Sequence, residues 1–174
     1  MPEEKIRFDD NNKLRENFIE NICVMKRWRE TLSRGKTARN LVDFHSRHKY
    51  LIMSHSVDSY RRMGKLVARS AEIEADILYR DYLEMLQTSL RQKATVPKHI
   101  NVLQHIFGYF KKQLSAEEKQ EVLSIFESYR ARQIPLIVPI TLLNHFVRKY
   151  QQPYLQLQVY LNPHPVELSL RNHD

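Results

Sequence analysis

Apolar side chains recur at steps of three and four residues from about Leu14 to residue 133, which is the period of an amphipathic α-helix. The pattern starts near Leu14 and is interrupted before Thr37, which can cap a second helix that runs to about His55. Ser56 can cap a third helix, and the sequence SAEE at 115–118 has the form of a capping box that opens a later one. We therefore predict a long helical body.

The last quarter of the chain is punctuated by proline. It holds five of the seven prolines, and the whole chain has only three glycines, fewer than a strand-rich protein normally needs for its turns. Residues 134–143 are apolar and predict a buried irregular crossing, with Pro139 opening a helix to about Tyr150. Residues 153–161 fit both an alternating strand and a helix. We predict the helix, because no partner strand is visible.

These patterns predict an all-α protein. We expect a single compact helical domain of about seven helices at 13–174, with a proline-punctuated C-terminal segment and a polar N-terminal tail at 1–12. The single cysteine, Cys23, excludes an internal disulfide and an iron–sulfur cluster held by one chain, and we expect no cofactor or metal. No apolar run is long enough to span a bilayer, so we expect a cytoplasmic protein without a membrane partner.

The positive charge of the chain is concentrated in one segment. The net charge is +8, and residues 26–69 hold twelve lysines and arginines against three acidic residues, a surplus of +9. The rest of the chain is therefore close to neutral. Such asymmetry favours a polyanionic partner, although a solubilising basic face would have the same composition.

Three histidines lie in this basic segment, within FHSRHKYLIMSHS at 44–56. On a helical wheel His48 and His55 share the apolar stripe, and His45 lies at its edge. His48 and His55 are roughly 10 Å apart at ~1.5 Å per residue, so they cannot share a metal on a continuous helix. His45 and His48 could share one, but no residue is an evident third ligand. We predict that His48 and His55 are structural, buried and hydrogen-bonded.

Acid–base chemistry by a histidine stays open as an alternative. His45, His48 or His105 could titrate near neutral pH. No recognisable nucleophile or phosphate-loop motif accompanies them in the sequence. Under this alternative the chain would be a small enzyme whose substrate the sequence does not indicate.

The cations of the basic segment are interspersed with aromatic residues, a composition that fits RNA binding. Arginine and lysine would contact phosphates, and Trp28 or Tyr60 would offer a ring for an unstacked base. A second contact area is indicated on a later helix, where polar side chains could read base edges and two lysines could hold phosphate. The predicted residues are Lys26, Arg27, Trp28, Arg29, Arg47, Lys49, Tyr60, Arg61 and Arg62 in the first area, and Asn101, Gln104, His105, Lys111 and Lys112 in the second.

Five blocks of the sequence also resemble a known family. They are LRENFIE (14–20), LVDFHSRHKYLIMSHS (41–56), NVLQHIFGYFKK (101–112), IPLIVPITLL (134–143) and PYLQLQVYLNPHPVELSLRN (153–172). In this order they resemble the YbgA-like family, a domain of unknown function. Some members are fused behind an iron–sulfur domain similar to the thiouracil desulfidases, and the resemblance implies that the YbgA-like part brings in thiolated tRNA. This chain lacks the cluster cysteines and resembles the free-standing second half.

The charge pattern and the resemblance together predict an RNA-binding module. The resemblance makes tRNA, including thiolated tRNA, the expected partner and leaves catalysis unassigned. The alternative is a protein adaptor that docks on a separate iron–sulfur desulfidase or another RNA-modifying enzyme. Its contact surface would be the apolar 134–143 segment or the NPHPVELSL tail at 162–170.

Overall fold

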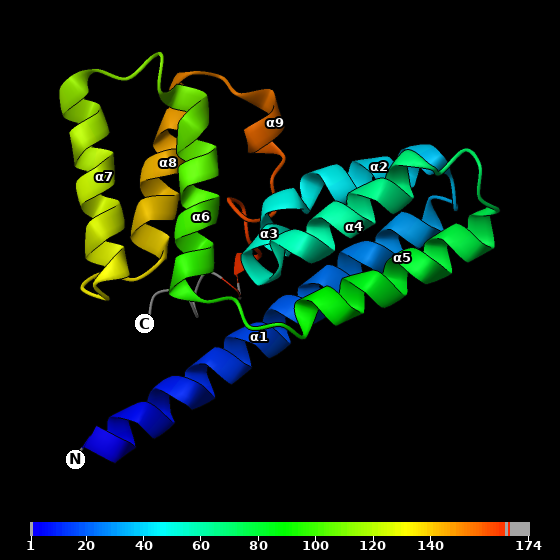
Figure 1. Ribbon diagram of the computed structural model, residues 1–174, viewed down its shortest axis with the longest axis horizontal. Coiled ribbons are helices and arrows are strands. Elements are labelled where there is room, and N and C mark those ends of the chain that lie inside the picture. Colours follow the sequence, from blue (N-terminus) through cyan, green and yellow to red (C-terminus); the bar gives the residue numbers. More distant parts are fainter. Residues whose placement is uncertain (1, 166, 168–174) are drawn as a thin grey trace.

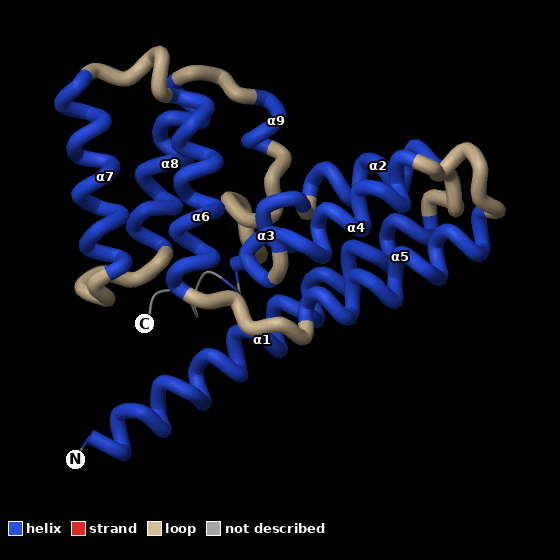
Figure 2. Tube along the Cα trace, viewed as in Figure 1, coloured by secondary structure: helices blue, strands red, loops and turns tan. Residues whose placement is uncertain are grey.

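The computed structural model describes residues 2–165 and 167, with side chains from residue 13 onward, and this part of the chain contains helices and no strand (Figure 2). The all-α prediction is confirmed. The helices are α1 (Pro2–Ser33), α2 (Ala38–Arg47), α3 (Lys49–His55), α4 (Val57–Ala68), α5 (Ala75–Leu90), α6 (Val96–Phe107), the 3₁₀ helix η1 (Gly108–Phe110), α7 (Ala116–Arg130), α8 (Ile137–Lys149) and α9 (Pro153–Gln156).

The helices form two groups that share one core (Figure 1). Helices α1, α2, α4 and α5 lie along one another, whereas α6, α7 and α8 stand together as a second group. Helix α3 packs on both α4 and α6 and so joins the groups, and α9 packs on α8. A single cluster of buried apolar side chains runs from Trp28 in α1 to Phe126 in α7. Burial of this shared cluster holds the two groups together as one compact domain.

Several helix ends lie where the sequence predicts them. The Thr37 hydroxyl accepts a hydrogen bond from the Asn40 N–H (3.1 Å) at the start of α2, and Ser56 caps α4 in the same way. Ser115 and Glu118 form a reciprocal capping box at the start of α7. Helix α1 begins at Pro2, so the backbone of the predicted polar tail is helical from that residue.

The helix predicted to run from Thr37 to His55 is broken at His48, which lies between α2 and α3. The C-terminal segment crosses at this point and takes two carbonyl groups of the helix as acceptors. The Val159 N–H donates to the Arg47 carbonyl (3.0 Å), and Gln158 Nε2 donates to the Ser46 carbonyl (2.8 Å). These partners lie more than a hundred residues away in the sequence, so helical periodicity could not predict the break.

The C-terminal quarter is more helical at 134–143 and less helical at 153–161 than predicted. Helix α8 begins at Ile137, so the irregular crossing is short, and Pro139 lies in the first turn of the helix. Helix α9 is a single turn, followed by turns that bury Val159 and Leu161. None of the helices in the described residues is both long and apolar enough to cross a membrane.

Candidate nucleic-acid interface

Half of the twelve cations in the basic segment are paired with carboxylates. Arg47 Nε lies 2.9 Å from both oxygens of Asp43, four residues earlier on the same helix. The other pairs are Arg34–Asp43, Lys36–Asp76, Arg62–Asp58, Arg69–Glu72 and Arg27–Glu167. All of these pairs except Arg27–Glu167 are exposed, and exposed pairs add little stability. They do reduce the positive potential that the surface presents to a polyanion.

The other six cations have no carboxylate partner among the described side chains: Lys26, Arg29, Arg39, Lys49, Arg61 and Lys65. Three of them gather around Tyr60. Lys49 Nζ lies 5.9 Å from the centroid of the Tyr60 ring, and Arg61 and Lys65 line a shallow hollow on α4 together with Tyr60. The predicted residue Arg62 lines the same hollow but is held by Asp58.

The buried ring of His45 stacks against the inner face of the Tyr60 ring. The two rings stack with their centroids 5.0 Å apart and their planes within 4° of each other. On its other side, His45 Nδ1 lies 3.0 Å from the Tyr82 hydroxyl. Burial, assisted by the nearby Lys49 charge, lowers the pKa of His45 to about 4, so the ring is neutral at neutral pH. His45 is therefore an enclosed, uncharged platform that fixes the orientation of Tyr60.

Two further tyrosines lie near Tyr60 on elements that are distant in the sequence. Tyr109 is in η1 and Tyr154 is in α9, and they are 40% and 37% exposed. Their ring centroids are 6.4 Å apart and their planes differ by 19°. Burial raises the pKa values of Tyr60 and Tyr154, and Tyr109 adds to the first shift and Tyr60 to the second, which places the three hydroxyl groups near one another. We call Tyr60, Tyr109 and Tyr154 the tyrosine shelf.

Sequence reasoning missed three of the residues at this site. Lys65 follows Arg61 by four residues on α4, and helical spacing could have placed both on one face. Tyr109 lies just before the predicted residues Lys111 and Lys112, but nothing in the sequence pattern indicated that its side chain is exposed. Tyr154 joins the shelf only because α9 folds back beside the second helical group (Figure 1).

The prediction that Trp28 offers a ring to an RNA base is wrong. Trp28 is 2% exposed and stacks on Tyr82 with centroids 5.4 Å apart, while its edge meets Phe44. An enclosed ring has no free face for a base. Its neighbour Arg27 also points inward, where Nη2 lies 3.5 Å from the nearly buried carboxylate of Glu167. Only Lys26 and Arg29 of the predicted α1 residues are exposed.

The second predicted contact area lies on α6 and the turn that follows η1. Gln104, His105 and Lys112 are exposed, and Asn101 is half-buried. Lys111 is exposed and its Nζ lies 5.8 Å from the centroid of the Phe107 ring. These side chains are accessible, and their contact with RNA remains a prediction.

His48 and His55 are buried and hydrogen-bonded, which confirms that part of the prediction, and their structural role stays a prediction. His48 Nδ1 donates to the Phe44 carbonyl (2.8 Å), and burial lowers the pKa of His48 to about 3. His55 donates from Nδ1 to the Gln92 carbonyl (2.6 Å) and from Nε2 to the Glu20 carboxylate.

Burial alone would lower the pKa of His55, but Glu20 and the Gln92 carbonyl raise it above its ordinary value. No three metal-ligating side chains converge within the part of the chain that the structure describes.

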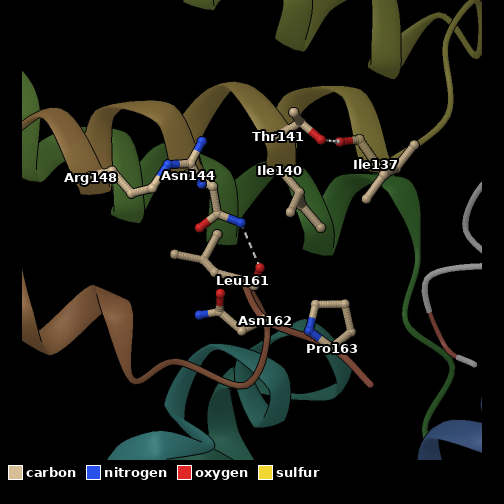
Figure 3. Close-up of a pocket in the computed structure, with 8 residues that line it drawn as sticks. All are labelled: Ile137, Ile140, Thr141, Asn144, Arg148, Leu161, Asn162 and Pro163. Atoms are coloured by element: carbon tan, nitrogen blue, oxygen red, sulfur yellow. Dashed lines mark hydrogen bonds between the residues drawn. The ribbon is translucent and has the colours of Figure 1, made fainter. Parts of the chain in front are cut away.

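A second hollow lies between α8 and the C-terminal crossing (Figure 3). Asn144 reaches across it, and its Nδ2 donates to the Leu161 carbonyl (2.7 Å). Arg148 stands at one end, and the remaining lining consists of Ile137, Ile140, Thr141, Leu161, Asn162 and Pro163. The hollow contains none of the predicted site residues and has one cation, so it is separate from the basic face.

Two comparisons with known proteins find similarities to this chain. Residues 49–165 match the family described as "Protein of unknown function (DUF1722)". The chain is also similar to the "Uncharacterized protein YbgA" of Escherichia coli (strain K12), with 30% identity over 167 residues that cover 95% of each protein. No solved structure matches. The first match covers more than half of the chain and the second nearly all of it, so the chain belongs to the DUF1722 family.

Proposed function

We propose that this protein is an RNA-binding module that contacts tRNA through the face formed by Lys49, Tyr60, Arg61 and Lys65. The observation that carries the proposal is the gathering of three cations without described carboxylate partners around one aromatic ring. Phosphate contacts supply most of the affinity in RNA complexes, and a cation that is free of carboxylates gives up less when it binds phosphate.

The tRNA assignment also draws on the sequence resemblance. In YbgA-like proteins fused to a desulfidase-like domain, the corresponding part is expected to bring in thiolated tRNA. The present chain has one cysteine and would supply binding rather than cluster chemistry. A separate iron–sulfur enzyme would then act on the RNA.

The test is a titration of labelled tRNA at several salt concentrations. Wild-type affinity should fall steeply with salt, and each lost phosphate contact should flatten the log–log slope by about 0.7 to 0.9. The double variant Arg61→Ala, Lys65→Ala should lower affinity and flatten the slope. The matched control is Arg91→Ala with Arg148→Ala, which removes the same charge from exposed positions outside the basic segment.

The neighbouring Arg62 sharpens the test, because Asp58 already holds its guanidinium. Arg62→Ala should change the slope less than Arg61→Ala. Equal losses from the Arg61/Lys65 pair and the Arg91/Arg148 control would mean that only net charge matters. Salt-independent binding, or none, would contradict the RNA proposal outright.

The alternative, a protein adaptor, is supported by a surface on α1 rather than by the predicted 134–143 segment. The 134–143 segment contributes Leu136, Ile140 and Leu143 to the core and is not a free contact surface. By contrast, Leu14, Phe18 and Ile22 form a stripe on α1 that is 49–66% exposed. Of the NPHPVELSL tail, residues 166 and 168–170 lie outside the described residues.

The charges around this stripe indicate what could cover it. Helical spacing places Arg15 and Arg29 beside the stripe, whereas Glu16 and Glu20 lie on the opposite face. A second copy of α1 would bring like charges together, so an apolar segment with acidic flanks in another protein is the better fit.

Photocrosslinking in cells tests the adaptor. A photoreactive residue at position 18 should yield one discrete adduct. Purification through a tag on the partner identified in that adduct should recover the same product. The control position is the similarly exposed Leu123 on α7. The same products from both positions would contradict a dedicated docking stripe.

A further inference from the structure

The tyrosine shelf has an arrangement that suits a flat aromatic ligand. Tyr109 and Tyr154 present partly exposed rings that are nearly parallel, and they come from two elements that meet only in the folded chain. Tyr60 lies beside them with its ring fixed on His45. Three aromatic rings are thus gathered at one place on the surface. A single exposed ring is common on protein surfaces, whereas a group of three indicates a binding site.

The rings of the shelf are held in place before any ligand arrives. The Tyr60 ring stacks on the enclosed ring of His45, and the Tyr109 and Tyr154 rings lie nearly parallel with their centroids 6.4 Å apart. A ring that is already oriented loses little conformational freedom when a ligand stacks on it. The shelf is therefore preorganised.

The charge of the shelf suits a nucleotide better than a cationic ligand. Burial and the neighbouring tyrosines raise the pKa of Tyr154 to about 12, so its hydroxyl stays neutral. Lys49 Nζ lies 5.1 Å from the Tyr50 ring and 5.9 Å from the Tyr60 ring, and Arg61 and Lys65 continue the positive charge along α4. A ligand with a flat base and adjoining phosphates matches both features.

We propose that Tyr60, Tyr109 and Tyr154 form a docking site for an unpaired nucleobase, with Lys49, Arg61 and Lys65 binding the adjoining phosphates. The inference rests on the proposed RNA binding and narrows it to single-stranded positions, such as loop nucleotides. A base within a duplex is stacked on its neighbours and cannot offer its face to the shelf. Stacking on an aromatic side chain contributes about 1–3 kcal/mol per base, which makes the site selective for accessible bases.

The experiment compares two fluorescently labelled RNA hairpins that have the same stem and the same phosphates. One has a loop of unpaired uridines, and the other has abasic nucleotides in the loop. The wild-type protein should bind the uridine loop roughly tenfold more tightly, the equivalent of about 1.4 kcal/mol of stacking. Arg61→Ala with Lys65→Ala should weaken both complexes by the same factor.

The shelf variants isolate the contribution of the rings. Tyr109→Ala with Tyr154→Ala should abolish the preference for the uridine loop and leave affinity for the abasic loop unchanged. Tyr109→Phe with Tyr154→Phe keeps the rings and should keep the preference, and if thermal unfolding shows the alanine pair to be misfolded, the single variant Tyr154→Ala takes the place of that pair. Leu123→Ala on α7 serves as the control for loss of an exposed apolar side chain.

Three results would overturn the inference. Equal, salt-dependent binding of both hairpins by the wild type would contradict the base site while leaving RNA binding intact. Binding of neither hairpin, and of no tRNA, would contradict RNA binding and the base site with it. Tyrosine-dependent binding of a polyproline peptide, with hairpin binding unaffected by the alanine pair, would identify the shelf as a peptide site.

Discussion

Two aromatic clusters lie on either side of His45, and one is closed while the other is open. In the closed cluster, Trp28 and Tyr82 are at most 2% exposed and stack face to face. In the open cluster, Tyr109 and Tyr154 keep more than a third of their surface in contact with solvent. His45 contacts both, because it bonds to Tyr82 and stacks on Tyr60.

The two clusters are expected to have different roles, one in stability and the other in binding. The closed cluster is surrounded by α1, α2 and α5, so its rings contribute apolar burial and exclude water. The open cluster combines rings from α4, η1 and α9, and Lys49 Nζ lies 5.9 Å from the centroid of its Tyr60 ring. The first cluster is expected to determine stability, and the second is free to determine binding.

The largest expected effect is that of emptying the closed cluster. Trp28→Ala should lower the free energy of unfolding by about 3–5 kcal/mol, because the cavity left by a buried tryptophan cannot collapse fully. Chemical denaturation followed by circular dichroism measures it. The folded fraction should bind tRNA with the wild-type salt slope. A stable Trp28→Ala protein that had lost RNA binding would reverse the roles assigned to the two clusters.

A change of pH is expected to have an intermediate effect on the free energy of unfolding, because His45 is enclosed between the clusters as a neutral ring. Its folded pKa of about 4 is below its ordinary value of 6.5, so the unfolded chain binds more protons between these two values. Stability should therefore be complete above pH 6.5 and fall as the pH drops towards 4, with His45 contributing about 3 kcal/mol.

The control for the pH effect is His45→Gln, which removes the titrating ring. This variant should be less stable at pH 7 but should lose less stability between pH 6.5 and 4 than the wild type. His48 adds a loss in the same direction, because its pKa is lowered to about 3. His55 acts in the opposite direction, since its raised pKa gives stability that is lost as the pH rises. Identical pH profiles for wild type and His45→Gln would contradict a buried neutral His45.

The helical fold could be predicted because its signals are local. Apolar spacing, the caps at Thr37, Ser56 and Ser115 and the scarcity of glycine all act over a few residues. The break at His48 depends on Val159 and could not be predicted in this way.

The candidate site could be predicted only in part. Arg61 and Tyr60 are neighbours in the sequence, and Lys49 falls in the same basic segment. A helical wheel could not tell that Trp28 faces the core and Tyr60 a partly open surface, because both occupy aromatic positions near cations. Tyr154 reaches the site through tertiary folding of α9, which no spacing rule describes.

The smallest expected effect on stability belongs to the open cluster. Tyr154→Ala should change the free energy of unfolding by less than about 1 kcal/mol, because Tyr154 is 37% exposed and the ring it stacks on, Tyr109, is exposed as well. The adjacent Leu155 provides a matched control on the same helical turn, since its side chain is fully buried. Leu155→Ala should cost roughly 2–5 kcal/mol.

The ratio of these two losses of stability shows whether the tyrosine shelf is a surface site or a part of the core. Tyr154 and Leu155 share a backbone segment, so a general loosening of α9 would affect both variants alike, whereas burial separates them. A loss for Tyr154→Ala close to that for Leu155→Ala would mean that the shelf is part of the core, and its rings would then be too constrained to receive a base. A small loss for Tyr154→Ala, together with loss of the preference for unpaired loops, is the combination that a surface built for binding requires.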